Sequence, residues 1–413
     1  MERTEFFRKK YPKFFYKGYF CKVSNGDLKI AFEFQTGKNV FFKPEINIKN
    51  IDKARLERIG KKELNNLVFH LGLMEIPTYW KAACSSEIVI EAGYLNKEQI
   101  VWWKDLIIKG MGQFFYENKI DWRTPGFLKI KCNQNNSFKR FDEKLKNRYL
   151  VPVGGGRDSI VTLEKLKKKQ INCFLVNPTK AARNVVKIAG FKSPILVERK
   201  IDPLLLDFNK KGYLNGHTPF TAVLSFLSVF CAVLFDCKNI VFSNESSADE
   251  GNVKYLGKEI NHQYAKSSDF EKKFKEYCKK YLAKEINYLS FLRKYNELEI
   301  SKMFAKNKKY FPFFSSCNLG QKVGERWCCN CPKCLFVYLT LYPFLKEKEL
   351  LNIFGKDVFE NRNLLSVMEG LIGKRMKPFE CVGTKKESKE ALDLSFKKAK
   401  KSGKIPYLLI KSK

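Results

Sequence analysis

The pattern of hydrophobic and polar residues changes near residue 148, which predicts two kinds of structure along the chain. The first part mixes short strand-like runs with longer helical stretches, namely Leu28–Phe34, Ile51–Leu71, Glu87–Ala92 and Lys97–Asn118. Strands and helices in this irregular order are typical of an α+β domain. We therefore expect residues 1–147 to form a smaller N-terminal α+β domain, with substrate recognition as its candidate role.

From residue 148 onward, apolar runs alternate regularly with amphipathic helical segments. The expected strands are Tyr149–Val153, Ile171–Val176, Pro194–Glu198 and Asn239–Ser243, and the helices between them are Ser159–Gln170, Lys180–Ala189 and Thr218–Phe235. This alternation predicts an α/β fold with a parallel sheet that binds its ligands at the carboxyl ends of the strands. We assign residues 148–385 to this catalytic domain and residues 386–413 to a basic tail that is mobile as far as Tyr407.

The net charge of +35 comes from 78 Lys and Arg residues against 43 Asp and Glu residues. Such an excess is typical of proteins that bind a polyanion, including nucleic acid. However, the lysines are spread along the chain, and Phe, Asn and Ile are also abundant, as a biased base composition would produce. No arginine-rich cluster stands out. We therefore expect a small-molecule substrate, with RNA binding as the open alternative.

Neither a signal peptide nor a membrane span is expected. The segment Met1–Lys10 has no apolar core. The longest apolar stretch, Thr221–Phe235, has about 15 residues and is too short to cross a bilayer. The 13 cysteines are odd in number and clustered, which favours thiol or metal chemistry in a reducing compartment over a disulfide framework. These features predict a cytoplasmic protein.

A glycine-rich turn follows the first strand of the α/β domain. Its residues, which are the candidate nucleotide-binding set, are Gly154, Gly155, Gly156, Arg157, Asp158 and Ser159. Glycines allow a ligand to approach the backbone closely, and the N–H groups at the start of the next helix attract phosphate. The spacing fits neither a Walker A loop nor a dinucleotide-binding fingerprint. A plain turn between a strand and a helix is the alternative interpretation.

This turn resembles the Ser-Gly-Gly-x-Asp-Ser pyrophosphate loop (PP-loop) of the ATP pyrophosphatases. The resemblance implies an adenine nucleotide α-hydrolase-like domain that cleaves ATP to AMP and pyrophosphate and adenylates a substrate. The first serine of the family pattern is replaced by Gly154, so one hydroxyl contact to phosphate is missing.

Polar residues also follow two other expected strands. Asn177 comes directly after Ile171–Val176, and Asn244, Glu245 and Asp249 lie at the end of Asn239–Ser243. Oxygen ligands at strand ends suit Mg²⁺ or the polar groups of a substrate near the nucleotide. An acidic, solvated loop is the alternative, although such a cluster is less expected in so basic a chain.

The chain has three histidines, and two of them are candidates for proton transfer. His262 is flanked by polar residues that include Tyr264, and His217 lies just before the helix that Thr218 could cap. Each could equally be an ordinary surface or core residue. His70 lies in an apolar helical segment, and we interpret it as structural.

Two segments near the end of the chain carry cysteines with candidate chemistry. Cys317, Cys328, Cys331 and Cys334 supply the four thiolates that a structural, tetrahedral Zn²⁺ needs. Their arrangement is similar to the zinc site of the deazaguanine nitrile synthases; free thiols or an iron–sulfur site are the alternatives. Cys381 stands next to Glu380, and this pair could serve as an acid and base or simply form a packed turn.

Five segments together carry a more specific resemblance. They are Val151–Ser159, Ser243–Asn252, Asn261–Lys266, Trp327–Leu335 and Pro378–Gly383. In this order and approximate spacing, the chain resembles the UDP-N-acetylmuramoyl-L-alanyl-L-glutamate epimerases over roughly residues 50–385. The resemblance implies an ATP- and Mg²⁺-dependent enzyme of peptidoglycan precursor synthesis that inverts the terminal glutamate and releases AMP and pyrophosphate.

With this resemblance, each candidate residue receives a hypothetical role. The glycine backbone and Ser159 would hold the β- and γ-phosphates, Arg157 would offset their charge, and Asp158 with Glu245 or Asp249 would hold Mg²⁺. His262 would be the leading base, and Tyr264, Cys381 and His217 are the candidates for a second acid or base. A tRNA-modifying adenylating enzyme and an inactive nucleotide-binding protein are the competing hypotheses.

Overall fold

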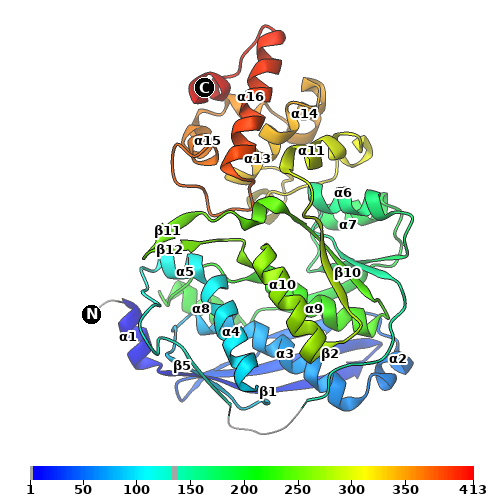
Figure 1. The fold of residues 1–413 in the computed structure, drawn as a ribbon, viewed down its shortest axis with the longest axis vertical. Coiled ribbons are helices and arrows are strands. Elements are labelled where there is room, and N and C mark those ends of the chain that lie inside the picture. The colour runs from blue at the N-terminus through cyan, green and yellow to red at the C-terminus, as the bar shows by residue number, and fades with distance from the viewer. Residues whose placement is uncertain (1–2, 133–137) are drawn as a thin grey trace. The chain divides into compact units, whose positions relative to one another are not determined.

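The computed structural model describes residues 3–132 and 138–413 and divides into two compact units (Figure 1). Unit 1 comprises Met1–Leu150, Ile195–Ile240 and Tyr255–Tyr288, and unit 2 comprises Val151–Pro194, Val241–Lys254 and Leu289–Lys413. Neither unit is continuous in sequence, because the chain passes between them several times. Each unit is built from three separate chain segments, whereas we expected an N-terminal domain followed by a C-terminal one.

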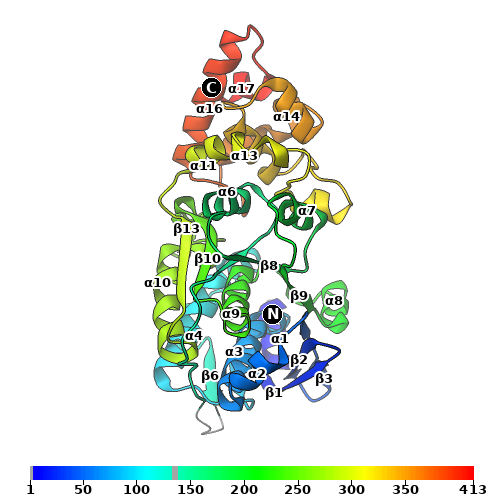
Figure 2. The same ribbon diagram turned by 90° about the vertical axis from the view of Figure 1, so that its right-hand side faces the viewer.

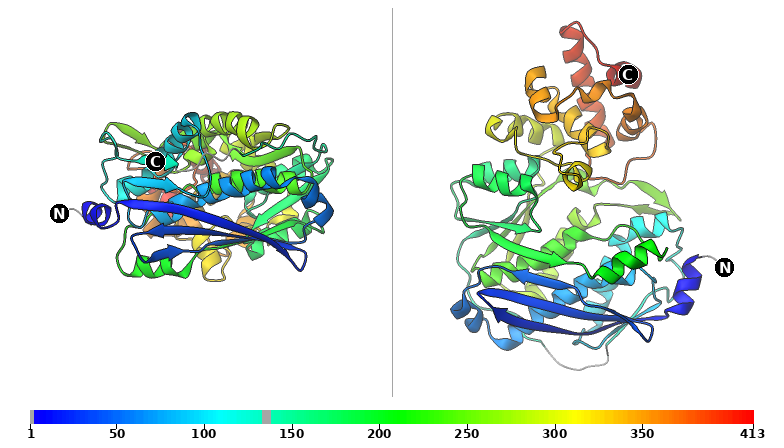
Figure 3. Two further views of the ribbon diagram at one scale, coloured as in Figure 1. Left: turned by 90° about the horizontal axis from the view of Figure 1, so that it is seen from below. Right: turned by 180° about the vertical axis from the view of Figure 1, so that it is seen from behind.

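Unit 1 contains a mixed sheet in the strand order β9-β4-β2-β1-β5-β6, with β3 paired to β2. The strands are β1 Lys13–Ser24, β2 Asp27–Thr36, β3 Val40–Phe42, β4 Glu45–Ile48, β5 Glu87–Ile90, β6 Lys129–Cys132 and β9 Ile195–Lys200. A tight turn joins β1 to β2, where Asn25 and Gly26 both have positive φ, as a type I′ hairpin requires. Figure 3 shows the long strands β1 and β2 in blue.

Unit 1 also contains helices from all three of its chain segments. They are α1 Arg3–Lys10, α2 Lys53–Arg58, α3 Lys61–Trp80, α4 Lys97–Gly110, α5 Gly112–Glu117, α8 Pro203–Lys210, α9 Phe220–Leu234 and α10 Ser268–Tyr277. The expected helix Ile51–Leu71 is split at Gly60, whose φ of +76° ends one helix before the next begins. Nearly all of α3 after Asn66 is buried, so this helix forms the centre of the core of unit 1.

His70 of α3 is part of that core, as its apolar surroundings predicted. Its Nδ1 donates to the carbonyl of Asn66 at 2.8 Å, and its Nε2 accepts from the hydroxyl of Tyr277 at 2.8 Å. Tyr277 in turn accepts hydrogen bonds from Trp103 and Gln99. Both ring nitrogens are therefore satisfied in the interior, which is a structural role.

Unit 2 contains the α/β segment that carries the glycine turn. Its strands are β8 Ile171–Val176 and the carboxyl-terminal residues of β7 Tyr149–Pro152, β10 Asn239–Glu245 and β13 Asn287–Leu292, in the order β13-β10-β7-β8. β7 and β10 are parallel, and the helices α6 Arg157–Leu166 and α7 Lys180–Ile188 follow β7 and β8. The sequence predicted this alternation to within a few residues. The mixed α/β class is thus confirmed, and the PP-loop fold remains a prediction.

The rest of unit 2 is helical (Figure 2). Its helices are α11 Glu297–Ala305, α12 Asn318–Lys322, α13 Pro332–Leu341, α14 Glu347–Phe354, α15 Leu365–Leu371, α16 Lys385–Lys401 and α17 Tyr407–Ser412. The expectation of a mobile tail is wrong here. A capping box between Thr384 and Glu387 starts α16, and Ala391, Leu392 and Ala399 are buried while the lysines lie outside. Among the described residues, no helix combines the length and apolar character that a membrane span requires.

Candidate active site

The glycine turn lies where the sequence placed it, between β7 and α6. Gly155 has a φ of +85°, and a Cβ atom there would lie only 2.5 Å from the backbone nitrogen of Ala182, at the start of α7. No other residue type fits this position, because both the conformation and the space exclude a side chain. Gly154 is exposed, and a Cβ atom on it would meet nothing within 4 Å. A ligand can therefore approach the backbone at Gly154.

A short segment after α11 holds the turn from the other side. The backbone nitrogen of Ser315 donates to the carbonyl of Gly155 at 3.1 Å, and a Cβ atom on Gly156 would lie 2.7 Å from Oγ of Ser316. The hydroxyl of Ser159 donates back to the carbonyl of Gly156 at 2.9 Å. These contacts fix the backbone of the turn before any ligand binds.

A pocket of ≈ 470 Å³ opens beside this turn. The residues that line it are Thr179, Lys180, Ala181, Asn184, Pro312, Phe313, Ser315, Gln321, Gly324, Glu325 and Arg326. Ala181 and Ser315 connect it to the turn, since both contact Gly155. Asn177 lies two residues before Thr179, at the carboxyl end of β8, and its φ is +43°. The volume and the position suit a small polar ligand such as a nucleotide.

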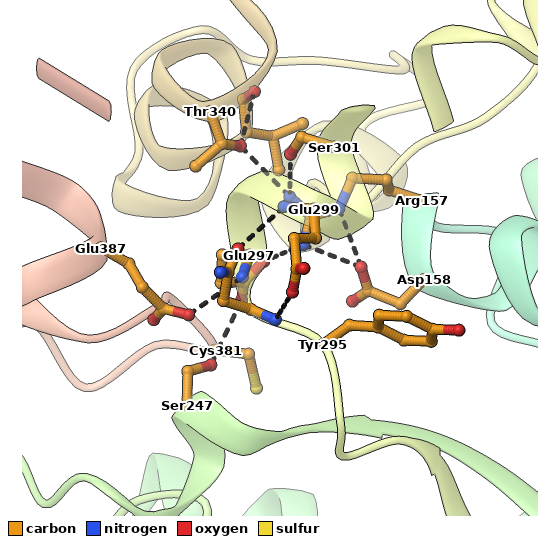
Figure 4. A network of polar contacts seen from close by, with 12 residues as sticks. Arg157, Asp158, Ser247, Tyr295, Glu297, Glu299, Ser301, Thr340, Cys381 and Glu387 are labelled. Carbon is orange, nitrogen blue, oxygen red and sulfur yellow. Dashed lines mark hydrogen bonds and ion pairs between the residues drawn. The ribbon is translucent and has the colours of Figure 1, made fainter. Parts of the chain in front are cut away.

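The side chain of Arg157 points into the protein, which differs from the role that the sequence suggested. It is only 2% exposed. Its guanidinium pairs with Glu297 and with Asp158 (2.8 Å) and donates to Ser301 at 2.8 Å and to Thr340 at 3.1 Å (Figure 4). Because the guanidinium is bound to these internal partners, it holds α6 against the other helices of unit 2.

Glu297, the first residue of α11, is the centre of that network. Its carboxylate also accepts from the hydroxyl of Ser247 at 3.3 Å, and its backbone nitrogen donates to Glu387 at 2.9 Å (Figure 4). Burial raises the pKa of Glu297 above its usual value; Arg157 opposes this rise, and the nearby carboxylates of Asp158 and Glu245 add to it. Three acidic side chains thus lie near the start of α6, together with the guanidinium of Arg157.

The polar segment after β10 is built into this region. Asn244 is buried and donates to the hydroxyl of Ser290 at 3.0 Å. Arg293 donates to the carbonyl of Glu245 at 2.7 Å and lies 3.9 Å from the carboxylate of Asp249. Glu245 is buried at the end of its strand, whereas the side chain of Asp249 is 42% exposed.

Three of the segments singled out in the sequence meet in unit 2. The ammonium of Lys377, only 1% exposed, pairs with Glu250 at 2.9 Å, and the side chain of Asn252 donates to the carbonyl of Pro378 at 2.7 Å. Lys333 of α13 donates to the carbonyl of Cys381. The half-buried thiol of Cys381 is thus carried by a segment that is anchored to both other motifs.

Two histidines that lie far apart in the sequence are neighbours in unit 1. The rings of His217 and His262 lie 4.2 Å apart, centre to centre, at an angle of 45°. Nδ1 of His262 lies 2.5 Å from Oε1 of Gln113, whose amide nitrogen donates to Glu117 at 2.6 Å. Because Glu117 orients the amide, its oxygen faces His262, so Nδ1 carries the proton and Nε2 carries the basic lone pair.

Both histidines of this pair are half-buried. Burial lowers the pKa of His217 to about 3, with further lowering by His262 and Lys81. Lys81 is itself buried, and its pKa is lowered to about 8 by burial and by Arg199. Its ammonium donates to the carbonyl of Gly216 at 3.0 Å. Perturbed pKa values in one cluster are a feature of functional sites.

Tyr264 lies in a different environment from the histidines. Its hydroxyl donates to Asp269 at 3.0 Å and contacts Asp105 at 3.4 Å. Burial, followed by these two carboxylates, raises the pKa of Tyr264 far above its usual value. The phenol is therefore held in its protonated form, which is unfavourable for a base.

The four cysteines converge in unit 2, as their spacing predicted. The Sγ atoms of Cys317, Cys328, Cys331 and Cys334 all lie within 4.8 Å of one another. Within residues 3–132 and 138–413, no other group of three or more His, Cys, Asp or Glu ligands is arranged to hold a metal ion. Cys329 lies outside the set, because its thiol contacts the carbonyls of Trp327 and Phe354.

Several residues of these networks were not predicted from the sequence. Glu297, Lys81 and Gln113 come from helices or loops distant in sequence from the residues that they contact. Lys81 did carry a signal, since it directly follows a long apolar helical run. Glu297 and Gln113 carried none that is separable from ordinary helical residues.

The fold and these sites define a mixed α/β protein with a candidate nucleotide-binding turn and a separate pair of histidines. The model of the MurL N-terminal domain matches residues 5–291, and the model of the MurL C-terminal domain matches residues 313–407. The chain therefore belongs to the MurL family, which confirms the resemblance seen in the sequence.

Three relatives are each named UDP-N-acetyl-alpha-D-muramoyl-L-alanyl-L-glutamate epimerase. The protein of Xanthomonas oryzae pv. oryzae is 33% identical over 324 residues, which cover 76% of this chain and 71% of the relative. The protein of Micromonospora sp. is 35% identical over 77% of this chain and 72% of its own length. That of Salinispora tropica is 34% identical over 77% and 70%, respectively.

Proposed function

We propose that this protein inverts the terminal L-glutamate of UDP-N-acetylmuramoyl-L-alanyl-L-glutamate to D-glutamate, in the synthesis of peptidoglycan precursors. Membership of the MurL family, with three relatives named for this epimerase, is the observation that carries the proposal. The glycine turn beside a pocket supports the finer proposal that ATP activates the substrate. The names of the relatives favour this function over a tRNA-modifying enzyme and over an inactive nucleotide-binding protein.

Activation by ATP makes chemical sense of the inversion. The α-proton of a free glutamate carboxylate is very weakly acidic, because its removal would place a second negative charge next to the first. Attack of a carboxylate oxygen on the α-phosphorus of ATP forms an acyl-adenylate and expels pyrophosphate. The activated carbonyl can then accept the electrons of the broken Cα–H bond. Return of a proton to the opposite face and hydrolysis by water yield the D-centre and AMP.

In this proposal, the backbone around Gly154–Gly156 and the first N–H groups of α6 bind the phosphates of ATP. The side chain of Arg157 holds the turn in place through Glu297 and does not itself contact phosphate. The pocket lined by Thr179 and Lys180 accepts the rest of the nucleotide.

The proposal assigns the carboxylates near this turn to Mg²⁺. Asp158 and Glu245 both raise the pKa of Glu297, so their negative charges lie close to the start of α6. Carboxylate oxygens together with phosphate oxygens are the ligands that Mg²⁺ prefers. Asp158 with Glu245 or Asp249 would hold the ion, which when bound neutralises phosphate charge. Carboxylates alone would otherwise repel the nucleotide.

His262 is the proposed base, because its Nε2 carries the lone pair while Gln113 holds the proton on Nδ1. His217 stays neutral near pH 7, since its pKa is about 3. The rings lie 4.2 Å apart, which leaves no room for a substrate carbon between them. The two histidines therefore cannot act on opposite faces of Cα. Cys381 and Tyr264 stay the candidates for the second acid, since the carboxylate partners of Tyr264 hold its phenol in the protonated form.

The test of this function is release of pyrophosphate from ATP by the purified protein, with and without the UDP-linked dipeptide. Chiral analysis of the glutamate after acid hydrolysis gives the stereochemical result. We expect pyrophosphate release to depend on the dipeptide and D-glutamate to accumulate. Dipeptide-dependent pyrophosphate release with only L-glutamate recovered would leave a ligase-like adenylating enzyme and refute the epimerase.

A further inference from the structure

The four converging cysteines are used by neither the nucleotide turn nor the histidine pair. We propose that Cys317, Cys328, Cys331 and Cys334 bind one structural Zn²⁺, and that this centre fixes the shape of the glycine turn. The second half of the proposal rests on the proposed binding of ATP at that turn, whereas the metal site itself does not.

The geometry of the thiols matches a tetrahedral zinc site. With zinc–sulfur bonds of about 2.3 Å, two ligands of a regular tetrahedron lie about 3.8 Å apart. The Sγ atoms of Cys317 and Cys331 lie 3.9 Å apart, and those of Cys328 and Cys334 lie 3.8 Å apart. All remaining pairs lie within 4.8 Å. One ion can therefore contact all four sulfurs with little movement of the chain.

The backbone around the thiols is arranged to stabilise thiolates. Sγ of Cys317 accepts from the nitrogens of Gly320 at 3.1 Å and Cys328 at 3.5 Å. Sγ of Cys331 caps α13 and accepts from the nitrogen of Cys334 at 3.4 Å. Such N–H donors disperse the negative charge that a set of four thiolates carries and orient the ligands around the metal.

The donor set selects the metal and its role. Four thiolates, three of them buried, leave no open position for water or substrate, which is the arrangement of a structural zinc site. Mg²⁺ and Ca²⁺ require oxygen ligands. An iron–sulfur cluster would distribute the four thiolates over several iron atoms and spread them more widely than these sulfurs are spread.

Two routes connect this centre to the glycine turn. In the first, the nitrogen of Cys317 donates to the hydroxyl of Ser315 at 3.1 Å, and the nitrogen of Ser315 donates to the carbonyl of Gly155. In the second, α13 begins at the ligand pair Cys331 and Cys334 and carries Thr340, which accepts from Arg157 at 3.1 Å. Loss of the metal releases the segment that holds the turn.

The experiment compares the wild-type protein with Cys328→Ser and Cys329→Ser, two neighbouring thiols of which only the first belongs to the site. Zinc and iron are measured by mass spectrometry on protein purified without added metal. We expect about one zinc ion per chain in the wild type and in Cys329→Ser, and a loss of most zinc in Cys328→Ser. Absence of zinc from the wild type, iron with acid-labile sulfide, or retention of zinc by Cys328→Ser overturns the metal site.

A second readout does not depend on a variant that folds. Cobalt exchanged into the wild type should give the intense visible absorption of a tetrahedral thiolate site. Its absence would also overturn the proposal.

Binding of ATP then tests the link to the turn. We expect the affinity of zinc-depleted protein for ATP to fall at least about tenfold, with recovery on readdition of zinc. Unchanged affinity would overturn the link. A zinc-loaded wild type that binds no ATP would instead contradict the proposed function and leave the metal site supported.

Discussion

His262 donates from Nδ1 to the side-chain oxygen of Gln113, which lies 149 positions earlier in the chain. Glu117 fixes the orientation of that amide through its second hydrogen bond. The tautomer of a candidate base is thus set by two hydrogen-bonded residues of one short helix, α5. We call the Gln113–Glu117 pair the relay. A histidine whose Nδ1 holds the proton has its lone pair on Nε2, and this nitrogen is suited to take a proton from carbon.

Removal of this relay should slow transfer of the α-proton without changing the binding of ATP. We expect Gln113→Leu to lower the rate of α-proton exchange by about tenfold or more, because His262 loses its fixed tautomer. Glu117→Gln is the matched control, since glutamine keeps an acceptor for the amide of Gln113, and it should exchange at close to the wild-type rate. Equal rates in Gln113→Leu and the wild type would show that the relay is irrelevant to the reaction.

The two neighbouring glycines at the tip of the turn should respond in opposite ways to a methyl group. Gly154→Ala and Gly154→Ser should fold normally, because a Cβ atom there meets nothing within 4 Å. Gly155→Ala should lose ATP binding by at least about tenfold, because its Cβ atom would force the turn away from α7. Calorimetric titration with ATP measures both. A Gly155→Ala protein that binds ATP normally would exclude the turn from the nucleotide site.

Gly154→Ser also restores the hydroxyl of the pattern that the turn resembles. We expect the variant to bind ATP at least as tightly as the wild type, because the side chain has open space in which to reach a phosphate. The same titration tests this, and weaker binding would indicate that the exposed side of Gly154 faces something other than phosphate.

Arg157 and Glu297 form an ion pair that is almost fully buried. Arg157→Met should destabilise the protein by about 3–5 kcal/mol, because it leaves a buried carboxylate without its partner. The double variant Arg157→Met/Glu297→Met removes both charges and should recover most of this loss. Urea unfolding measures the free energies. A double variant as unstable as the single one would show that the pair is not the source of the effect.

His70 should make the protein sensitive to acid. Burial lowers its pKa to about 4, whereas an unfolded histidine has a pKa of about 6.5. Between these values the unfolded chain binds more protons than the folded one, so stability falls as pH falls. At pH 5 the loss amounts to about 2 kcal/mol from this one residue. His70→Gln should lower overall stability but flatten its dependence on pH between about 4 and 6.5. If the free energy of unfolding of His70→Gln depends on pH as steeply as that of the wild type, another group causes the acid sensitivity.

The local pattern of the sequence predicted the elements that carry chemistry better than it predicted their surroundings. The glycine turn, the strand before it and the four-cysteine cluster depend on residues close in sequence, and each was found as expected. The lysine-rich tail was wrongly predicted to be mobile. That prediction relied on composition and did not use the spacing of Ala391, Leu392 and Ala399 along one helical face.

Contacts between segments far apart in the sequence could not be predicted from local patterns. Arg157 looked like a phosphate ligand because of its neighbours in sequence, yet its partner Glu297 lies 140 positions away. In the same way, no periodicity could pair His217 with His262 or bring Lys81 next to Gly216. These arrangements follow from tertiary packing, which also determines the pKa values of the residues concerned.

We propose that adenylation of the glutamate carboxyl group makes the neighbouring Cα–H group acidic enough to lose its proton. The most direct measurement is incubation of the protein with the UDP-linked dipeptide, ATP and Mg²⁺ in deuterated water, followed by mass spectrometry of the glutamate. We predict deuterium at Cα, formation of AMP, and loss of both without ATP. Turnover of ATP with the original hydrogen still on Cα would contradict the account.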